Sequence, residues 1–244
     1  MSVPTFHFVT LFPETIQIWM TTSILGRAHK AGLFDFKIYQ LRDYSTAKHL
    51  NVDDVAYGGG GGMVLQLEPL VRAVESIQEN LKAKTSQVIY FSPAGQRLNH
   101  TLVHKWATSN TITDFIFICG HYEGVDQRFI DHWVDAEISL GDFVITGGEL
   151  PALATADAMI RQLEGTLGSK TTAQTESFSL TSGDSLLLEY PHYTRPSEYR
   201  GIKVPEILLS GNHSAIEAWR LEEATKRTME KRPDLLKPSS TETT

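Results

Sequence analysis

The feature that most constrains the fold is a set of short strand-like segments with few or no polar positions. Residues 88–91 and 115–119 are wholly apolar, and residues 6–11 are mostly so. A strand without alternating polar positions is buried on both faces, as in parallel sheets covered by helices. Helical segments separate these strands along the chain. The expected fold class is therefore α/β, with a mostly parallel sheet.

Helices and a further strand are expected between these segments. One helix should begin near Pro13, because proline suits the first helical turn, and should run to Gly32 as its C-cap. A strand over residues 34–41 follows it. Residues 68–84 carry apolar side chains at helical spacing. These side chains are Leu70, Val74, Ile77 and Leu81.

The chain should fold as two regions joined by a linker. Residues 1–164 form the larger region and residues 178–236 the smaller one. Between them, residues 165–177 are small and polar with little periodicity, as in a flexible linker or mobile lid. Residues 237–244 are a polar tail, which we expect to be disordered.

Helices are expected on both sides of this linker, over residues 151–163 and 214–231. The second should begin with a capping box, in which Ser214 and Glu217 each bond to the other's backbone amide.

The net charge of −7 argues against nucleic-acid binding, so any such surface must be a local patch. Residues 219–232 carry five basic and three acidic side chains. By the helical period, Arg220, Arg227 and Lys231 fall at about 0°, 340° and 20° and form one basic stripe. Such a stripe suits phosphate contacts, which orient nucleic acid without reading its sequence. The alternative is a solvated helix face.

The cellular location follows from what the sequence lacks. The single cysteine, Cys119, excludes an internal disulfide and fits a reducing compartment. The N-terminus does not have the pattern of a secretory signal. The apolar runs are far shorter than the ~20 residues that span a bilayer. We expect a cytoplasmic protein without a membrane segment.

Two glycine-rich loops are candidates for close ligand contact, because glycine lets backbone amides approach without a Cβ. Residues 58–62 are all glycine, but no lysine and Ser/Thr follow, which disfavours a Walker-type phosphate loop. Residues 120–124 (GHYEG) directly follow a buried strand, where ligands of parallel sheets often bind. The alternatives are a flexible hinge and a plain strand-to-helix turn.

Residues 140–151 (LGDFVITGGELP) mix glycines, acids and apolar side chains. This mixture suits an apolar slot with exposed backbone donors and acceptors, as a flat purine requires. The alternative is a tight turn between two core strands. Three other features are typical of a surface when taken alone: Glu176 in the linker, Arg161 on the preceding helix, and the His-Tyr-Arg run within residues 191–196.

Together and in this order, the segments resemble the bacterial tRNA (guanine-N1)-methyltransferase family, TrmD, over residues 6–236. Collinear matches across nearly the whole chain are hard to explain by chance. The matching runs are Leu11-Phe12-Pro13-Glu14, Val52-Asp53-Asp54, Tyr57-Gly58-Gly59-Gly60, Tyr122-Glu123-Gly124-Val125-Asp126, residues 140–151, 191–196 and 208–213, and Trp219-Arg220.

The resemblance implies a SPOUT-class fold, whose α/β layer is tied in a deep trefoil knot, with a small, mainly helical C-terminal domain that binds tRNA. Knots are too rare for a periodicity argument to propose one. S-adenosylmethionine would bind in the knot, and a homodimer would complete each site. The product would be N1-methylguanosine immediately 3′ of the anticodon, at position 37. Magnesium is also implied, although the sequence has no strong metal motif.

The resemblance further implies two sets of contact residues. The cofactor-binding set is Tyr90, Phe91, Ser92, Pro93, Gly120, Tyr122, Glu123, Gly124, Leu140, Gly141, Asp142, Phe143, Val144, Ile145, Gly147 and Gly148. The tRNA-binding set is His49, Asp53, Gly58, Gly59, Gly60, His192, Arg195, Arg220, Arg227 and Lys231.

Methylation of guanine N1 needs a base for the N1 proton and a donor for the O6 oxygen. The resemblance places these catalytic roles at Glu176 and Arg161. Glutamate stands where the family has aspartate, which lengthens the reach by roughly 1.5 Å, one bond length. Two smaller departures are Gly61, where proline is usual, and His121, where arginine is common.

Two other functions stay open at this point. One is a knotted methyltransferase that acts on a ribose hydroxyl of RNA. The other is a non-catalytic module that binds RNA or a nucleotide. Arg161 and Glu176 together favour an enzyme over such a module.

Overall fold

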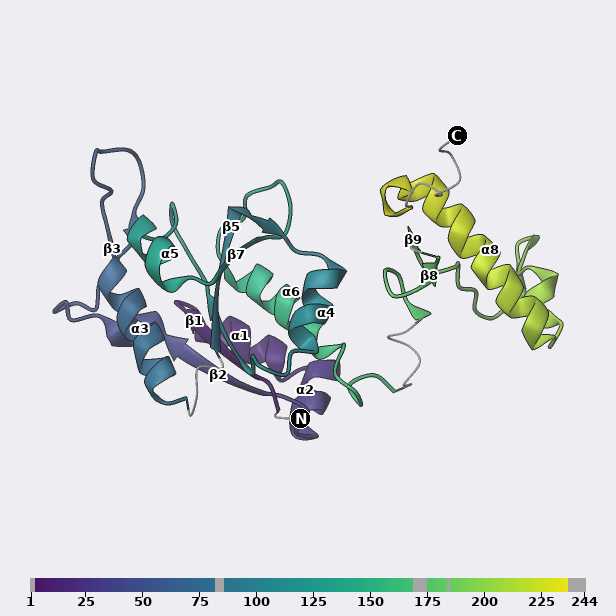
Figure 1. Ribbon diagram of the computed structural model, residues 1–244, viewed down its shortest axis with the longest axis horizontal. Coiled ribbons are helices and arrows are strands. Elements are labelled where there is room, and N and C mark those ends of the chain that lie inside the picture. The colour runs from purple at the N-terminus through teal and green to yellow at the C-terminus, as the bar shows by residue number, and fades with distance from the viewer. Residues whose placement is uncertain (1–2, 82–85, 169–174, 184, 237–244) are drawn as a thin grey trace. The chain divides into compact units, whose positions relative to one another are not determined.

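The chain folds as two compact units, residues 1–168 and residues 169–244 (Figure 1). The structure is a computed structural model that describes residues 3–81, 86–168, 175–183 and 185–236. The expected disordered tail, residues 237–244, and residues 169–174 of the expected linker lie outside the described residues.

Unit 1 (residues 1–168) is built on a five-stranded sheet in the order β2-β1-β6-β5-β7 (Figure 1). All neighbouring strands in this sheet are parallel, which confirms the expected α/β class. The strands are β1 (Thr5–Thr10), β2 (Asp35–Gln40), β5 (Ser86–Arg97), β6 (Asp114–Ile118) and β7 (Ala136–Ser139). A separate antiparallel pair, β3 (Asp53–Asp54) and β4 (Val64–Leu65), flanks the run of glycines.

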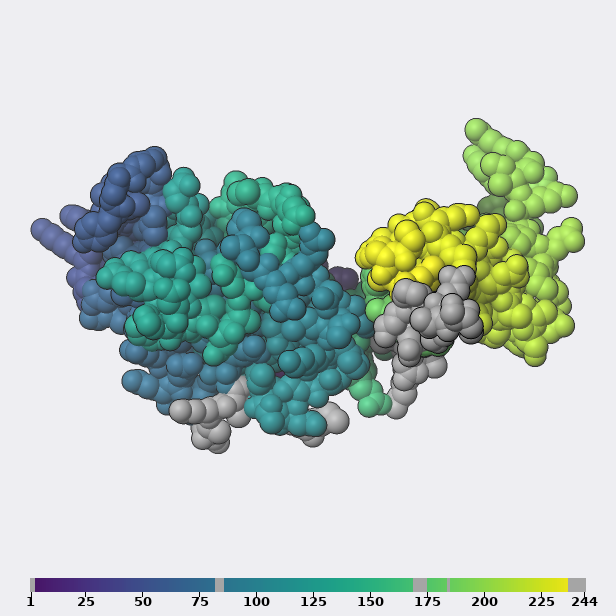
Figure 2. Space-filling model, turned by 45° about the horizontal axis from the view of Figure 1, so that its top comes forward, coloured from purple at the N-terminus to yellow at the C-terminus, as the bar shows by residue number. Residues whose placement is uncertain are grey.

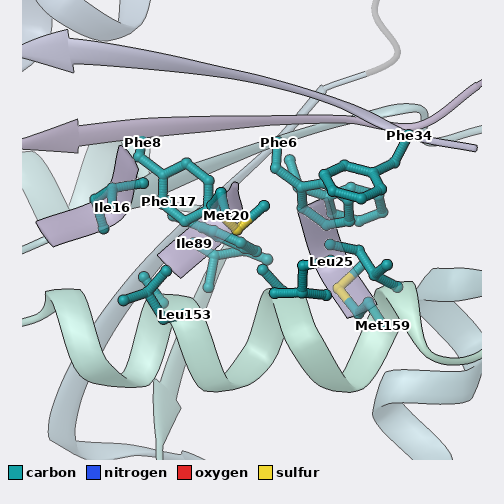
Figure 3. Packing of buried hydrophobic residues seen from close by; sticks show 14 of the residues in the cluster. Phe6, Phe8, Ile16, Met20, Leu25, Phe34, Ile89, Phe117, Leu153 and Met159 are labelled. Atoms are coloured by element: carbon teal, nitrogen blue, oxygen red, sulfur yellow. The ribbon is translucent and has the colours of Figure 1, made fainter. Parts of the chain in front are cut away.

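Helices pack against both faces of the sheet, because its central strands are apolar on both sides. In β1, Phe6 and Phe8 belong to one core and Val9 to the other. Figure 3 shows the first core, where Phe6 and Phe8 face Leu153 and Met159 of α6. The first core includes residues of α1 (Pro13–Met20), α2 (Ser23–Lys30), α4 (His100–Ala107) and α6 (Glu149–Ile160), and the second includes residues of α3 (Leu67–Glu79) and α5 (Gln127–Trp133).

The expectation of a single helix from Pro13 to Gly32 is wrong, because the segment breaks into two helices at Thr21 and Thr22. The hydroxyls of both threonines donate to carbonyl oxygens in the last turn of α1. Such local bonds compete with continuation of a helix. Gly32 does follow the second helix, with a φ of +73° that favours glycine.

Several other boundaries also differ from expectation. The helix expected over residues 68–84 ends at Glu79, although residues 82–85 lie outside the described range. The helix expected over residues 151–163 begins and ends earlier, as α6. Strand β5 extends well beyond residues 88–91, because it pairs again with β7 after a shift of register.

Within its described residues, unit 2 (residues 169–244) contains one long helix, α8 (His213–Lys231). The capping box expected at Ser214 is wrong. Asn212 is the N-cap, and its side-chain oxygen accepts from the Ala215 amide at 3.2 Å. In the described part of this unit, the other elements are β8 (Thr181–Ser182), β9 (Ser185–Leu186), β10 (Glu198–Tyr199), β11 (Ile202–Lys203), and the 3-10 turns η2 (Glu206–Leu209) and η3 (Pro233–Leu235).

A buried histidine links three strands of the sheet. His7 is 1% exposed, and its two ring nitrogens lie 3.0 Å from the Tyr39 hydroxyl and 3.0 Å from a carboxylate oxygen of Asp114. Burial lowers the pKa of His7 below its ordinary value, although Asp114 opposes this shift. Burial also raises the pKa of Tyr39 to about 12. At neutral pH the folded protein therefore holds His7 as neutral imidazole.

The lowered pKa of His7 predicts that acid destabilises the fold. Below the ordinary histidine pKa of about 6.5, the unfolded chain binds a proton that the folded chain does not bind until its lower pKa is reached. The free energy of unfolding should therefore decrease across this window. Urea unfolding at about pH 7.5 and about pH 5.5 should show that the stability advantage over His7→Gln shrinks in acid. An advantage that grows in acid would contradict the prediction.

Candidate functional site

A cavity opens beside β5 and the carboxyl ends of β6 and β7, at the edge of a parallel sheet where ligands usually bind. Its volume is about 210 Å³. Its walls come from three segments of the chain, within residues 90–93, 120–124 and 138–151. The lining residues are Tyr90, Phe91, Ser92 and Pro93 of β5, residues 120–124 after β6, Ile138 and Ser139 of β7, residues 140, 141 and 143–148 after β7, and Pro151 of α6.

The structure brings together all the expected cofactor-binding residues except one. The exception is Asp142, whose exposed carboxylate accepts a hydrogen bond from Arg97 at 2.7 Å. The cavity is also lined by residues outside the expected contact set. Three of them lie within the segments expected to contact a ligand, and two directly precede such a segment: His121, Thr146 and Pro151, and Ile138 and Ser139. Each of these is a close sequence neighbour of an expected residue, so proximity to the motifs was the available signal.

The cavity exists because the backbones of two loops lie against each other. The Gly148 amide donates to the Gly120 carbonyl at 2.8 Å, and His121 forms an isolated β-bridge with Gly147. A Cβ on Gly148 would lie 2.6 Å from the Cys119 Cα and 2.7 Å from the Gly120 nitrogen. Both distances are too short for a side chain, so the close approach requires glycine.

Tyr90 lines the cavity with an almost fully buried ring. A Cβ on Gly120 would lie 2.9 Å from this ring, so the loop after β6 packs directly on it. Burial, assisted by the charge of Glu137, raises the pKa of Tyr90. Its phenol therefore stays protonated and can act as a hydrogen-bond donor. The Ser92 hydroxyl donates to the same Glu137 carboxylate.

The two candidate catalytic residues lie in different units. Arg161 is the C-cap residue of α6 in unit 1. On the same helix, burial raises the pKa of Asp157, while the charge of Arg161 and a hydrogen bond from Trp19 oppose that shift. Glu176 is in unit 2, where its backbone carbonyl accepts from the Leu180 amide at 3.1 Å.

The expected tRNA contacts of unit 1 are His49, Asp53 and the glycines of residues 58–60. They lie on or near the exposed loop between β3 and β4, which is at the surface in Figure 2. His49 is exposed, and Asp53 begins β3. A Cβ on any glycine of residues 58–60 would meet nothing within 4 Å, yet each has a positive φ. Conformation, rather than packing within this chain, thus calls for glycine here.

The expected tRNA contacts of unit 2 differ in their surroundings. The Arg220 side chain contacts other residues of unit 2. Its guanidinium lies 4.8 Å from the centre of the Tyr190 ring and pairs with Glu217 of the same helix. Arg227 and Lys231 line a shallow hollow on α8. The stripe is therefore not a uniform row of equally available cations. The remaining expected residues of this unit, His192 and Arg195, are both exposed.

Over residues 5–238, the sequence matches the family described as tRNA (Guanine-1)-methyltransferase TrmD. The chain belongs to this family. A tRNA (guanine-N(1)-)-methyltransferase from Brevibacillus brevis is 49% identical over 93% of this chain and 89% of its own length. One from Bacillus subtilis is 46% identical over 94% and 91%. The crystal structure of tRNA (m1G37) methyltransferase from Aquifex aeolicus has 40% identity and a TM-score of 0.75, and covers 96% of this chain and 95% of that one.

Gly61 is one of the positions where the sequence departs from the pattern that the resemblance implies. Gly61 has open space around it and no positive φ, so another residue would fit there. In the part of this TrmD family member that the structure describes, no helix is long and apolar enough to cross a membrane.

The close approach at Gly148 predicts that a single methyl group opens the cavity. In Gly148→Ala, the new Cβ must push the loop after β7 away from Cys119 and Gly120. Overpacking of this kind costs about 1–3 kcal/mol, which thermal unfolding would detect. The matched control is Gly61→Ala, whose Cβ meets nothing within 4 Å. Equal midpoints for the two variants would show that the contact does not constrain the loops.

Proposed function

We propose that this chain transfers the methyl group of S-adenosylmethionine to N1 of the guanosine immediately 3′ of the anticodon, at position 37, in tRNA. The observation that carries the proposal is the cavity between two glycine loops in a chain of the TrmD family. The chain is thus a tRNA (guanine-N1)-methyltransferase, and the family implies S-adenosylmethionine as the donor.

The residues that line the cavity suit the chemistry of S-adenosylmethionine. Ile138, Leu140 and Pro151 supply apolar side chains for a flat adenine. The glycines of both loops let backbone amides and carbonyls approach its polar edge. A Cβ on Gly141 would lie 2.8 Å from the Phe143 ring, so a larger residue would reshape this loop. When bound, S-adenosylmethionine supplies a methyl group already activated by its sulfonium.

The chain's own residues must then align the guanine and remove a proton, and alignment accounts for much of such a barrier. The residues that line the cavity would hold S-adenosylmethionine, which would supply the methyl group for guanine N1 and keep the electron pair of the carbon–sulfur bond on its sulfur. The N1 proton passes to the Glu176 carboxylate, a contribution of roughly 10²–10⁴-fold. Arg161 donates to O6, where negative charge develops.

We infer that the chain around the cavity forms the deep trefoil knot of the SPOUT class. Two observations support this inference. The loops after β6 and β7 lie against each other, although β5 lies between these two strands in the sheet. The likeness to the Aquifex aeolicus structure also extends over nearly the whole chain.

A homodimer is the proposed assembly, with each site completed by the partner subunit. Helices α1 and α6 pack together, and both carry large exposed apolar side chains. Exposed apolar patches of this kind mark interaction surfaces. The exposed fractions are 67% for Ile18 and 52% for Trp19 of α1, 61% for Leu150 of α6, and 57% for Phe143 and 83% for Val144 in the loop after β7.

Residues 1–164 are the proposed catalytic domain, 165–177 a linker or lid, and 178–236 the tRNA-binding domain, with the enzyme acting in the cytoplasm. Magnesium, which the resemblance implied, has no evident site. Among the described residues, no three His, Cys, Asp or Glu side chains gather in a way that could hold a metal ion. No catalytic step is therefore assigned to magnesium.

Methyl transfer to an anticodon stem-loop tests the proposed function. A transcript with guanine immediately 3′ of the anticodon should accept a methyl group, and one with adenine there should not. Nucleoside analysis should identify N1-methylguanosine. A ribose-methylated product would favour the other kind of knotted methyltransferase. No heat of S-adenosylmethionine binding in calorimetry would favour a non-catalytic module.

Glu176→Gln should lose methyl transfer by roughly 10²–10⁴-fold while it retains S-adenosylmethionine binding, because the amide cannot take up the N1 proton. Glu176→Asp should retain most of the activity. The control is Glu206→Gln, which removes an exposed carboxylate of η2 in the same unit. Single-turnover rates and calorimetry provide both readouts. Normal turnover of Glu176→Gln would assign the base to another group.

Arg227→Glu should weaken tRNA binding and lower its salt dependence. Each phosphate contact that is lost reduces the slope of log K against log salt by about one unit. Lys105→Glu makes the same change of net charge on an exposed residue of α4 and serves as control. Filter binding at several salt concentrations measures both slopes. An unchanged slope for Arg227→Glu would remove α8 from the tRNA interface.

A further inference from the structure

Glu149 is a buried carboxylate beside the cavity, and two side chains donate hydrogen bonds to it. The Thr10 hydroxyl donates to one oxygen at 2.6 Å, and the His121 ring nitrogen Nε2 lies 2.7 Å from the other. Glu149 is 6% exposed and Thr10 is 0% exposed. Because an ionised carboxylate only accepts hydrogen bonds, this contact assigns to His121 the tautomer with its proton on Nε2.

The network closes on itself through Phe12. The Phe12 amide donates to the Thr10 hydroxyl at 2.9 Å, so this hydroxyl both accepts and donates. The Phe12 ring lies 4.9 Å from the His121 ring, centre to centre. Three parts of unit 1 are thereby joined: the end of β1, the loop after β6, and the first residue of α6. Phe12, the second residue of the Leu-Phe-Pro-Glu run, thus takes part in this network.

The network also reaches the wall of the cavity. His121 lines it, and a Cβ on Gly147 would lie 2.3 Å from the His121 ring. The imidazole therefore lies against the loop after β7, whose end leads directly into Glu149. If the bonds to Glu149 were lost, the His121 ring could rotate away from the loop after β7, and only the backbone contacts would then hold the two cavity loops together.

We propose that Thr10, His121 and Glu149 are positioning residues that hold the two cavity loops in the geometry that binds S-adenosylmethionine. The inference rests on the proposed function. Thr10 is the informative member, because it does not line the cavity. Any effect of Thr10 on cofactor affinity must therefore pass through its hydrogen-bonded neighbours.

Thr10→Val tests the inference, because it keeps the shape of the side chain and removes the hydroxyl. The matched control is Thr228→Val on α8, which is also 0% exposed and whose hydroxyl, like that of Thr10, both donates and accepts, here to the Ala224 carbonyl and from the Leu188 amide. Calorimetry with S-adenosylmethionine and steady-state kinetics on the stem-loop are measured for both. Thr10→Val should weaken cofactor binding and raise the KM for S-adenosylmethionine about tenfold, since the buried Glu149 carboxylate loses the Thr10 hydroxyl as a donor. Thr228→Val should lower the thermal midpoint but leave the cofactor KM unchanged.

A second pair of variants tests the positioning role of the network if Thr10→Val does not fold. His121→Leu removes the donor to Glu149 and should raise the cofactor KM by at least as much, whereas His121→Gln keeps an amide donor and should restore most of the affinity. Equal cofactor affinity in Thr10→Val and wild type, or in His121→Leu and His121→Gln, would overturn the inference. A wild-type enzyme that neither binds S-adenosylmethionine nor methylates the stem-loop would instead overturn the proposed function.

Discussion

Where Gly148 lies against Cys119 and Gly120, two loops at the ends of parallel strands come within hydrogen-bonding distance. The position of α6 depends on this contact, because Gly148 is the residue before the helix. From there α6 carries Leu153 into the main core and ends at the candidate catalytic Arg161. A backbone contact that only glycine allows therefore adjoins both the cavity and the start of the helix that contributes to the core and ends at the candidate catalytic arginine.

The sheet was the part of the fold that the sequence predicted best. Residues 88–91 and 115–119 are apolar without alternation, and strands of that kind are buried on both faces. Strand β7 was not predicted, because it has only four residues, AEIS, within a stretch interrupted by glycines. The helix break after α1 was not predicted either, because it depends on the local hydrogen bonds of Thr21 and Thr22 rather than on apolar periodicity.

The candidate site was predictable only as a set of segments. Composition marked residues 140–151 as a ligand slot, and the collinear resemblance narrowed the ligand to S-adenosylmethionine. Side-chain partnerships could not be predicted in this way, because they depend on which loops meet in space. His121 and Glu149 are 28 residues apart, and Arg220 meets Tyr190 from another part of its unit. No periodic pattern of the sequence reports such pairs.

Glu149 shows why the exceptions to sequence rules carry functional information. A buried carboxylate is costly unless donors and favourable dipoles compensate it. Here two donors and the N-terminal end of α6 do so. An apolar residue of similar size would fill the same space without needing donors from Thr10 and His121. Only a group that accepts from both can link the end of β1 to the loop after β6, so the carboxylate is better explained by the cavity it shapes than by the stability of α6.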